Sequence, residues 1–275
     1  MRYCFFILIV FLSACSPQVS SFVNEASDNA VVPSPTKTIS PSPFQSPAQS
    51  PTPEPTKVSI PTPTQTPANT PPVVPPPKDR VVDNKMTFFS QAPYELWDEL
   101  HQEACEEASM IMVNYFKKEK KLDRHTMEQE ILSLVSWQKE NGYQVDITAQ
   151  QVQNILQLYY NIESELSLNV SVDSMKEALD AGHVIIVPAA GRMLKNPYFS
   201  GRGPIYHMLV VRGYDENTKE FITNDPGTKR GEGFRYSYSR LLNAIHDWPK
   251  PGSVQGSVND AEMEKGVPAM VIIQR

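Results

Sequence analysis

The segment Gln102-Glu103-Ala104-Cys105-Glu106-Glu107-Ala108-Ser109 opens a helical pattern and carries a cysteine near its start. Apolar or weakly polar side chains recur at Cys105, Ala108, Met112 and Tyr115, and their spacings of 3, 4 and 3 residues place them on one face of a helix. We therefore predict a helix over residues 104–120. A thiol at a helix N-terminus lies at the positive end of the helix dipole, which favours the thiolate.

The other two cysteines lie in the N-terminal segment. Cys4 borders the apolar run 5–12, which is shorter than the roughly 20 residues that a membrane-spanning helix needs. Cys15 closes Leu12-Ser13-Ala14-Cys15, which resembles a bacterial lipobox. The resemblance implies that residues 1–15 are a lipoprotein signal peptide, cut before Cys15, and that Cys15 is acylated. The acyl chains would anchor the protein to the bacterial membrane on its extracytoplasmic side, in the periplasm or at the cell surface.

Cys105 is then the one thiol left free in the mature protein. No intrachain disulfide can form with a single thiol, although exported proteins usually pair their cysteines. A lone thiol outside the reducing cytosol is more typical of a catalytic nucleophile, and the alternative is a buried structural cysteine.

Composition separates a linker from a folded domain. Sixteen of the 25 prolines lie between Pro33 and Pro77, among Ser, Thr, Gln and Ala. Proline fixes the backbone angle φ and removes a donor, so residues 16–79 are predicted to be a disordered, extended spacer without a core. Aromatic and aliphatic residues return in 80–275, a stretch long enough for one domain.

The charge and motif content excludes several kinds of partner. The net charge is −6 and no basic patch with interleaved aromatic residues occurs, so nucleic acid is not an expected partner. No group of His, Cys and carboxylate residues has zinc-ligand spacing, and Gly201-Arg202-Gly203 lacks the context of a phosphate loop. We therefore expect no metal and no cofactor.

The hydrophobic period changes from helical to strand-like at about residue 183. Helices come first and antiparallel-looking strands second, which predicts an α+β fold. Thr126 with Gln129 and Thr148 with Gln151 form capping-box patterns at two helix starts. The further predicted helices span about 126–141, 148–159, 172–182 and 238–245. The predicted strands are 85–89, 183–187, 206–211 and 220–223, with edge strands at 233–236 and 269–273.

A cysteine, a histidine and an aspartate occur along the chain in the order that a cysteine nucleophile and its base would need. Cys105 begins a helix, His207 lies in the predicted strand 206–211, and Asp225 follows the next strand. A cysteine nucleophile needs an adjacent base, and that base needs a third group to hold its ring and tautomer.

Several segments resemble the papain-like cysteine peptidases, and within them the bacteriocin-processing, double-glycine peptidase-like members of the stand-alone exported branch. These segments are 88–93, 97–98, 102–109, 207–215 and 224–227. The resemblance spans roughly 85–275 and implies a papain-like fold, in which a helical half carries the Cys and an antiparallel sheet half carries the His and Asp. It implies that Cys105 is the nucleophile, His207 the general base and acid, and Asp225 the residue that orients His207.

The resemblance also implies a glutamine that donates to the oxyanion. Family members often have it about six residues before the Cys, where this chain has Glu99. Gln91 and Gln102 are the two candidates, and Gln91 is favoured because Gln102 stands so close to the helix.

The expected function is a membrane-anchored, extracytoplasmic cysteine hydrolase that cleaves amide bonds in a peptide or protein through an acyl-enzyme. The alternative is an inactive papain-like binding or scaffold domain. Negative charge from Glu106 and Glu107 would oppose thiolate formation at Cys105, unless these carboxylates point to solvent or to a cation. His101 could also act as the base, but a surface position in a loop is favoured for it. Substrate specificity and oligomeric state stay open.

Overall fold

A computed structural model describes residues 80–253 and 256–275. The predicted signal peptide with Cys15 (1–15) and the predicted linker (16–79) lie outside these residues. No helix in the described part of the chain is long and apolar enough to cross a membrane.

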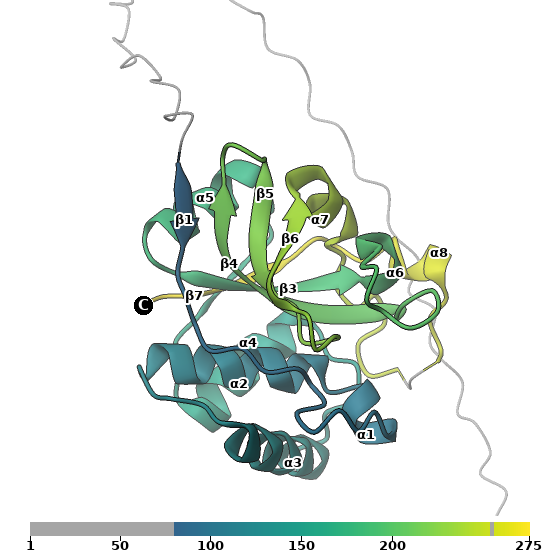
Figure 1. Ribbon diagram of the computed structural model, residues 1–275. Helices are drawn as coiled ribbons and strands as arrows, with labels where there is room; N and C mark the ends of the chain where they lie inside the picture. Colours follow the sequence, from purple (N-terminus) through teal and green to yellow (C-terminus); the bar gives the residue numbers. More distant parts are fainter. Residues whose placement is uncertain (1–79, 254–255) are drawn as a thin grey trace, which may run out of the picture. The chain divides into compact units, whose positions relative to one another are not determined.

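An antiparallel sheet forms the centre of the described domain (Figure 1). Its strands run in the order β2-β7-β3-β4-β5-β6, and β1 pairs with the C-terminal end of β4. Gly213 of β4 permits this pairing, because a Cβ there would lie 2.1 Å from the Val82 carbonyl oxygen. The strands are β1 (Val81–Asp83), β2 (Glu165–Ser167), β3 (Val184–Ala190), β4 (Tyr206–Asp215), β5 (Glu220–Asn224), β6 (Glu232–Ser237) and β7 (Met270–Ile273).

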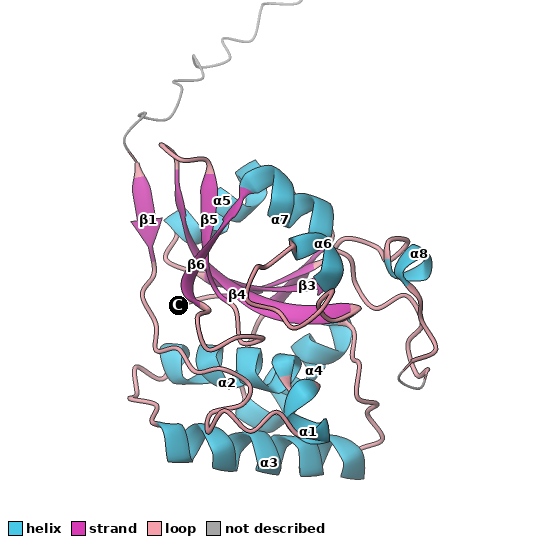
Figure 2. Ribbon diagram, turned by 45° about the vertical axis from the view of Figure 1, so that its right-hand side comes forward, coloured by secondary structure: helices cyan, strands magenta, loops and turns pink. Residues whose placement is uncertain are grey.

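Helices cover both faces of this sheet (Figure 2). Helices α2 and α4 pack against β3, with α2 also on β4 and α4 on β7, while α3 packs on α2. Helices α5 and α7 lie on the opposite face. The helices are α1 (Glu99–Gln102), α2 (Cys105–Lys117), α3 (Arg124–Glu140), α4 (Ala149–Tyr160), α5 (Val172–Asp180), α6 (Gly191–Leu194), α7 (Tyr238–Ala244) and α8 (Asp260–Met263).

Two hydrophobic cores explain the continuous apolar run of β3. Val184 and Ile186 belong to the core beneath α2 and α4, whereas Ile185 and Val187 belong to the core beneath α5 and α7. Successive side chains of a strand point to opposite faces, so a sheet covered on both sides needs apolar residues at every position. The α+β fold predicted from the sequence is confirmed.

Some predicted elements differ from the structure. Residues 85–89 form no strand. The backbone N–H of Asn84 still donates to the Arg212 carbonyl oxygen of β4, while its side chain donates to the carbonyl oxygens of Leu179 and His183, and the pairing with β4 ends there. The apolar side chains that follow pack as a loop on the helical side. The last strand, β7, lies inside the sheet rather than at its edge, because the short strand β2 pairs with its outer side. The first turn of α3 is capped by Asp123, not Thr126.

Candidate active site

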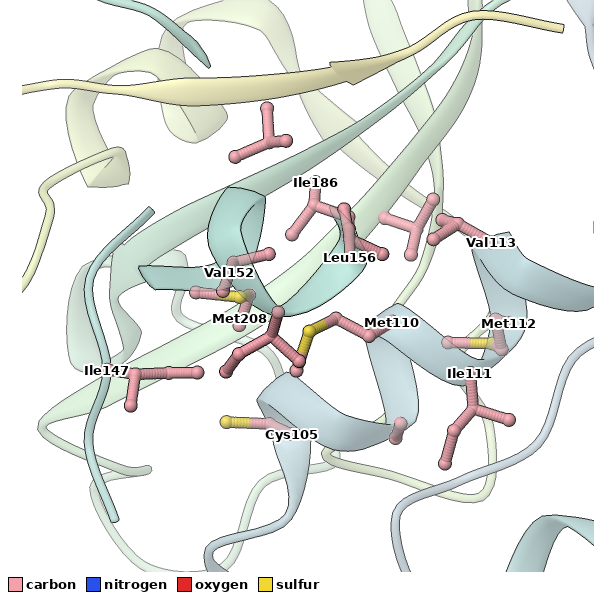
Figure 3. Packing of buried hydrophobic residues seen from close by; sticks show 14 of the residues in the cluster. Cys105, Met110, Ile111, Met112, Val113, Ile147, Val152, Leu156, Ile186 and Met208 are labelled. Atoms are coloured by element: carbon pink, nitrogen blue, oxygen red, sulfur yellow. The ribbon is translucent and has the colours of Figure 1, made fainter. Parts of the chain in front are cut away.

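Cys105 is the first residue of α2, as the sequence predicts, and is only 6% exposed. Figure 3 shows its side chain at the first turn of the helix, among the apolar side chains of Ile147, Met110 and Met208. No side chain caps this helix. The first backbone N–H groups of a helix have no partner within it, so the start of α2 offers donors beside the thiol.

The thiol also contacts a carboxylate. Cys105 Sγ donates a hydrogen bond to Glu106 Oε2 at 3.0 Å. Burial, followed by the negative charges of Glu106 and Glu107, raises the pKa of the Cys105 thiol well above its usual range, and the backbone N–H of Met208 only partly opposes this. These surroundings favour the protonated thiol over the thiolate.

His207 lies near the start of β4 and is buried. Its Nε2 lies 2.8 Å from Oδ1 of Asp225, the residue that follows β5. The antiparallel pairing of β4 with β5 aligns Val210 with Asn224, which brings the end of β5 towards the start of β4. The sequence order of strand, turn and strand thus produces the imidazole–carboxylate contact.

Asp225 is completely buried and accepts four hydrogen bonds. Oδ1 accepts from His207 and from the backbone N–H of Gly227, and Oδ2 accepts from Asn196 Nδ2 at 2.9 Å and from the Tyr236 hydroxyl at 2.6 Å. Burial alone would raise the pKa of Asp225, but His207, Tyr236 and Asn196 outweigh it and hold the pKa below its usual range. Asp225 is therefore a carboxylate.

A carboxylate can only accept, so the proton of a neutral His207 ring lies on Nε2 and the lone pair lies on Nδ1. The ring is also held from the side by Phe199, whose centroid lies 5.3 Å away in an edge-to-face arrangement. Gly227 completes the fit, because a Cβ there would lie 2.8 Å from His207 Cε1. His207 thus has one defined orientation and one defined tautomer.

Cys105 and His207 line the same cleft, which has a volume of about 420 Å³. Gln91 and Gln102 contribute to its wall, and Asp225 stands behind His207. The other lining residues are Trp97, Glu103, Asp146, Phe199, Ser200, Gly203, Pro204, Tyr206 and Gly227. Every site residue predicted within the described domain therefore lies in this cleft or directly behind it.

The two glutamines differ in their bonding. Gln91 is 3% exposed, and its Nε2 donates to the carbonyl oxygens of His101 and Gln102, while its Oε1 has no hydrogen-bond partner in the described residues. Gln102 is exposed and its Nε2 donates to the Trp97 carbonyl oxygen. Both amide protons of Gln91 therefore hold the segment that leads into Cys105, and its role as oxyanion donor stays a prediction.

An oxyanion is a stronger acceptor than a backbone carbonyl oxygen, so we expect one N–H of Gln91 to exchange a carbonyl for the oxyanion during the reaction. Gln91→Ala is then expected to lower kcat by about 10²- to 10³-fold, the usual effect of losing an oxyanion donor, and Gln102→Ala far less. The measurement is steady-state kinetics of both variants, with thermal unfolding to detect any loosening of the residues 98–104. The reverse ranking would assign the role to Gln102.

Local sequence patterns do not reveal Asn196 or Tyr236. Asn196 follows α6 in a loop and Tyr236 lies in β6, so neither belongs to a recognisable motif. Only the tertiary pairing of β5 with β6 brings Tyr236 to Asp225. His101, expected at the surface, is 5% exposed and its ring contacts Asp98 and Glu128.

Glu106 and Glu107 are buried rather than directed to solvent, with exposures of 1% and 4%. Burial raises the pKa of Glu107 to about 7, and burial together with Glu107 and Asp146 raises the pKa of Glu106. Burial, with a smaller effect of Glu103, also raises the pKa of Asp146 to about 6. The start of α2 is thus surrounded by carboxyl groups that resist ionisation. In residues 80–253 and 256–275, no three His, Cys, Asp or Glu side chains form a group that could hold a metal ion.

The sequence profile of the Peptidase_C39 like family matches residues 84–254. A crystal structure of a Bacillus anthracis protein assigned as a C39-like peptidase aligns with 72% of this chain and 99% of its own, at 14% sequence identity and a TM-score of 0.43. No curated protein matches the chain.

Proposed function

The chain belongs to the Peptidase_C39 like family, a family of papain-like cysteine peptidases, and we propose that it cleaves amide bonds through Cys105, His207 and Asp225. The observation that carries this proposal is the buried His207–Asp225 pair in the cleft that Cys105 lines. The family supports a peptide or protein as substrate.

In the proposed reaction, His207 Nδ1 takes the proton of the Cys105 thiol as the sulfur attacks the scissile carbonyl carbon. The carbonyl oxygen gains the negative charge, which backbone N–H groups at the start of α2 and a glutamine amide stabilise. His207 then gives its proton to the leaving amine as the C–N bond breaks. Water then attacks the thioester, with His207 Nδ1 taking a proton from it. The C–S bond breaks, the carboxylic acid product leaves, and His207 returns its proton to the Cys105 sulfur.

Asp225 holds the imidazole through every step of this cycle. The carboxylate keeps the proton on Nε2 when the ring is neutral and stabilises the imidazolium when Nδ1 gains a proton. Because the surroundings of Cys105 favour the protonated thiol, its proton is expected to leave together with nucleophilic attack.

A non-catalytic binding domain is the second candidate. The hydrogen bond from Cys105 to Glu106 favours it, because negative charge beside the sulfur opposes the thiolate. A screen of quenched fluorescent peptides separates the two functions. The enzyme hydrolyses at least one peptide class, and Cys105→Ala abolishes turnover. Equal turnover in wild type and Cys105→Ala would come from a contaminant and would favour the binding domain.

The proposed location is the extracytoplasmic face of a bacterial membrane, with Cys15 as the lipidated residue. The sequence pattern around Cys15 is its support. A Cys15→Ala variant is expected to leave the detergent-soluble membrane fraction or to stay unprocessed, as seen by fractionation and immunoblotting. Unchanged fractionation and processing of Cys15→Ala would contradict the lipid anchor.

A further inference from the structure

A second cavity adjoins the cleft on the helical side of the domain. It has a volume of about 680 Å³ and lies between α1, the start of α2, α3 and the segment 143–145. We call it the acidic pocket, because four of its lining residues are Asp98, Glu99, Glu103 and Glu107, whereas Lys139 is its one basic lining residue. The remaining lining residues are Leu100, Ala104, Val135, Gln138, Tyr143, Gln144 and Val145.

One wall residue of the acidic pocket lies close to the nucleophile in the sequence. Glu103 lines both the acidic pocket and the cleft. It precedes Cys105 by two residues, so the two Cα atoms lie at most about 7.6 Å apart. A substrate whose scissile bond lies at Cys105 can therefore extend a side chain past Glu103 into the acidic pocket.

Two buried acceptor atoms in the pocket wall lack partners in the described part of the chain. Glu107 and Gln138 are each 4% exposed and both line the pocket. Glu107 Oε2, Gln138 Oε1 and Gln138 Nε2 form no hydrogen bond of normal length there, although the Gln138 side chain lies close enough to Glu107 to lower its pKa. A buried acceptor without a donor is costly, and a group that donates several hydrogen bonds would satisfy both acceptors.

The charges of the pocket wall indicate that this donor is a cation. Asp98 accepts from the backbone and ring of His101, and Glu107 is the buried acid of the wall, with the uncharged amide of Gln138 beside it. Burial raises the pKa of Glu107 to about 7, and a bound cation would favour its ionised form. Ammonium and guanidinium groups supply both the positive charge and several N–H donors.

We propose that the acidic pocket is a substrate subsite that receives an amine or guanidinium group close to the scissile amide. The subsite rests on the proposed function, since it orients a substrate for attack by Cys105. It defines the substrate class as peptides with a basic group beside the cleavage site.

Matched active-site probes test this inference. The probes are tripeptidyl acyloxymethyl ketones that carry norleucine at all three positions or lysine at one of them. The rate of Cys105 labelling, followed by intact-protein mass spectrometry, is expected to be about 10- to 100-fold higher for one lysine probe than for the norleucine probe, the range that a charge-assisted hydrogen bond supplies. Glu107→Gln should bring this ratio close to one.

The ratio of two probes on the same variant cancels any change in thiol reactivity. Glu163→Gln, an exposed acid outside the acidic pocket, is the matched control and should keep the wild-type ratio. Ratios near one for all lysine probes on wild type, or an unchanged preference in Glu107→Gln, would overturn the subsite.

A binding measurement separates failure of the subsite from failure of the proposed function. Cys105→Ala protein is titrated calorimetrically with the tripeptide amides that correspond to the probes. One lysine peptide should bind about 10-fold more tightly than the norleucine peptide, and Glu107→Gln in the same background should remove the difference. If no probe labels Cys105 but this preference is found, the subsite stands and the peptidase fails. Equal affinities would overturn the subsite even in an active enzyme.

Discussion

Asp225→Asn is expected to lower kcat by about 10³- to 10⁴-fold while the domain remains folded. The amide keeps the size of the carboxylate but presents one oxygen and one NH₂ group to the four donors around it. If the NH₂ group faces Nε2 of His207, the ring must offer a lone pair there and carry its proton on Nδ1. That tautomer cannot take the thiol proton.

Steady-state kinetics on the best peptide of the hydrolysis screen measures this effect, with circular dichroism to verify the fold. Tyr236→Phe is the matched control, because it removes one donor to Asp225 and leaves the contact with His207 in place. It should lower kcat less than about tenfold. An Asp225→Asn enzyme with more than a tenth of the wild-type kcat would mean that Asp225 does not fix the tautomer of His207.

Stability is expected to fall as pH rises from about 4.5 to 7. The pKa of Glu107 is raised from 4.5 to about 7 in the folded protein, so the folded state binds more protons than the unfolded state in this window. The resulting loss is about 3 kcal/mol for this group. The pKa values of Glu106 and Asp146 are also raised, and they add to the loss in the same direction.

Asp225 has the opposite sign but acts outside this window. Its pKa is lowered, so its stabilising effect is present above its unfolded pKa of 3.8 and is lost only in more acidic solution. Urea unfolding at pH 5 and at pH 8 measures the difference. Glu107→Gln should be less sensitive to pH than the wild type, whereas Glu163→Gln should behave like the wild type. Equal pH dependence in Glu107→Gln and wild type would show that Glu107 ionises normally in the folded state.

The sequence predicts the scaffold of the site because strong local patterns define it. Helical spacing places Cys105 at a helix start, and strand-type runs place His207 on one strand and Asp225 directly after the next. A buried strand, a turn and another buried strand pair most simply as antiparallel neighbours. These local signals therefore fix the relative order of the three residues.

The environment of the thiol is not predictable in the same way. An amphipathic helix would direct Glu106 and Glu107 to solvent, but α2 is buried from Cys105 to Asn114 because the sheet covers one side of it and α3 and α4 the other. The partners of Asp225 also come from a loop and an outer strand that carry no motif. Both features depend on tertiary packing, which the periodicity of a short segment does not reveal.

Identification of the acyl-enzyme tests the central claim most directly. The protein is mixed with an activated ester of the best peptide, quenched in acid within seconds and mapped by peptide mass spectrometry. The proposed mechanism predicts an acyl group on Cys105 in the wild type and formation at least about 100-fold slower in His207→Ala. An acyl group on another residue, or equally fast formation in His207→Ala, would contradict it.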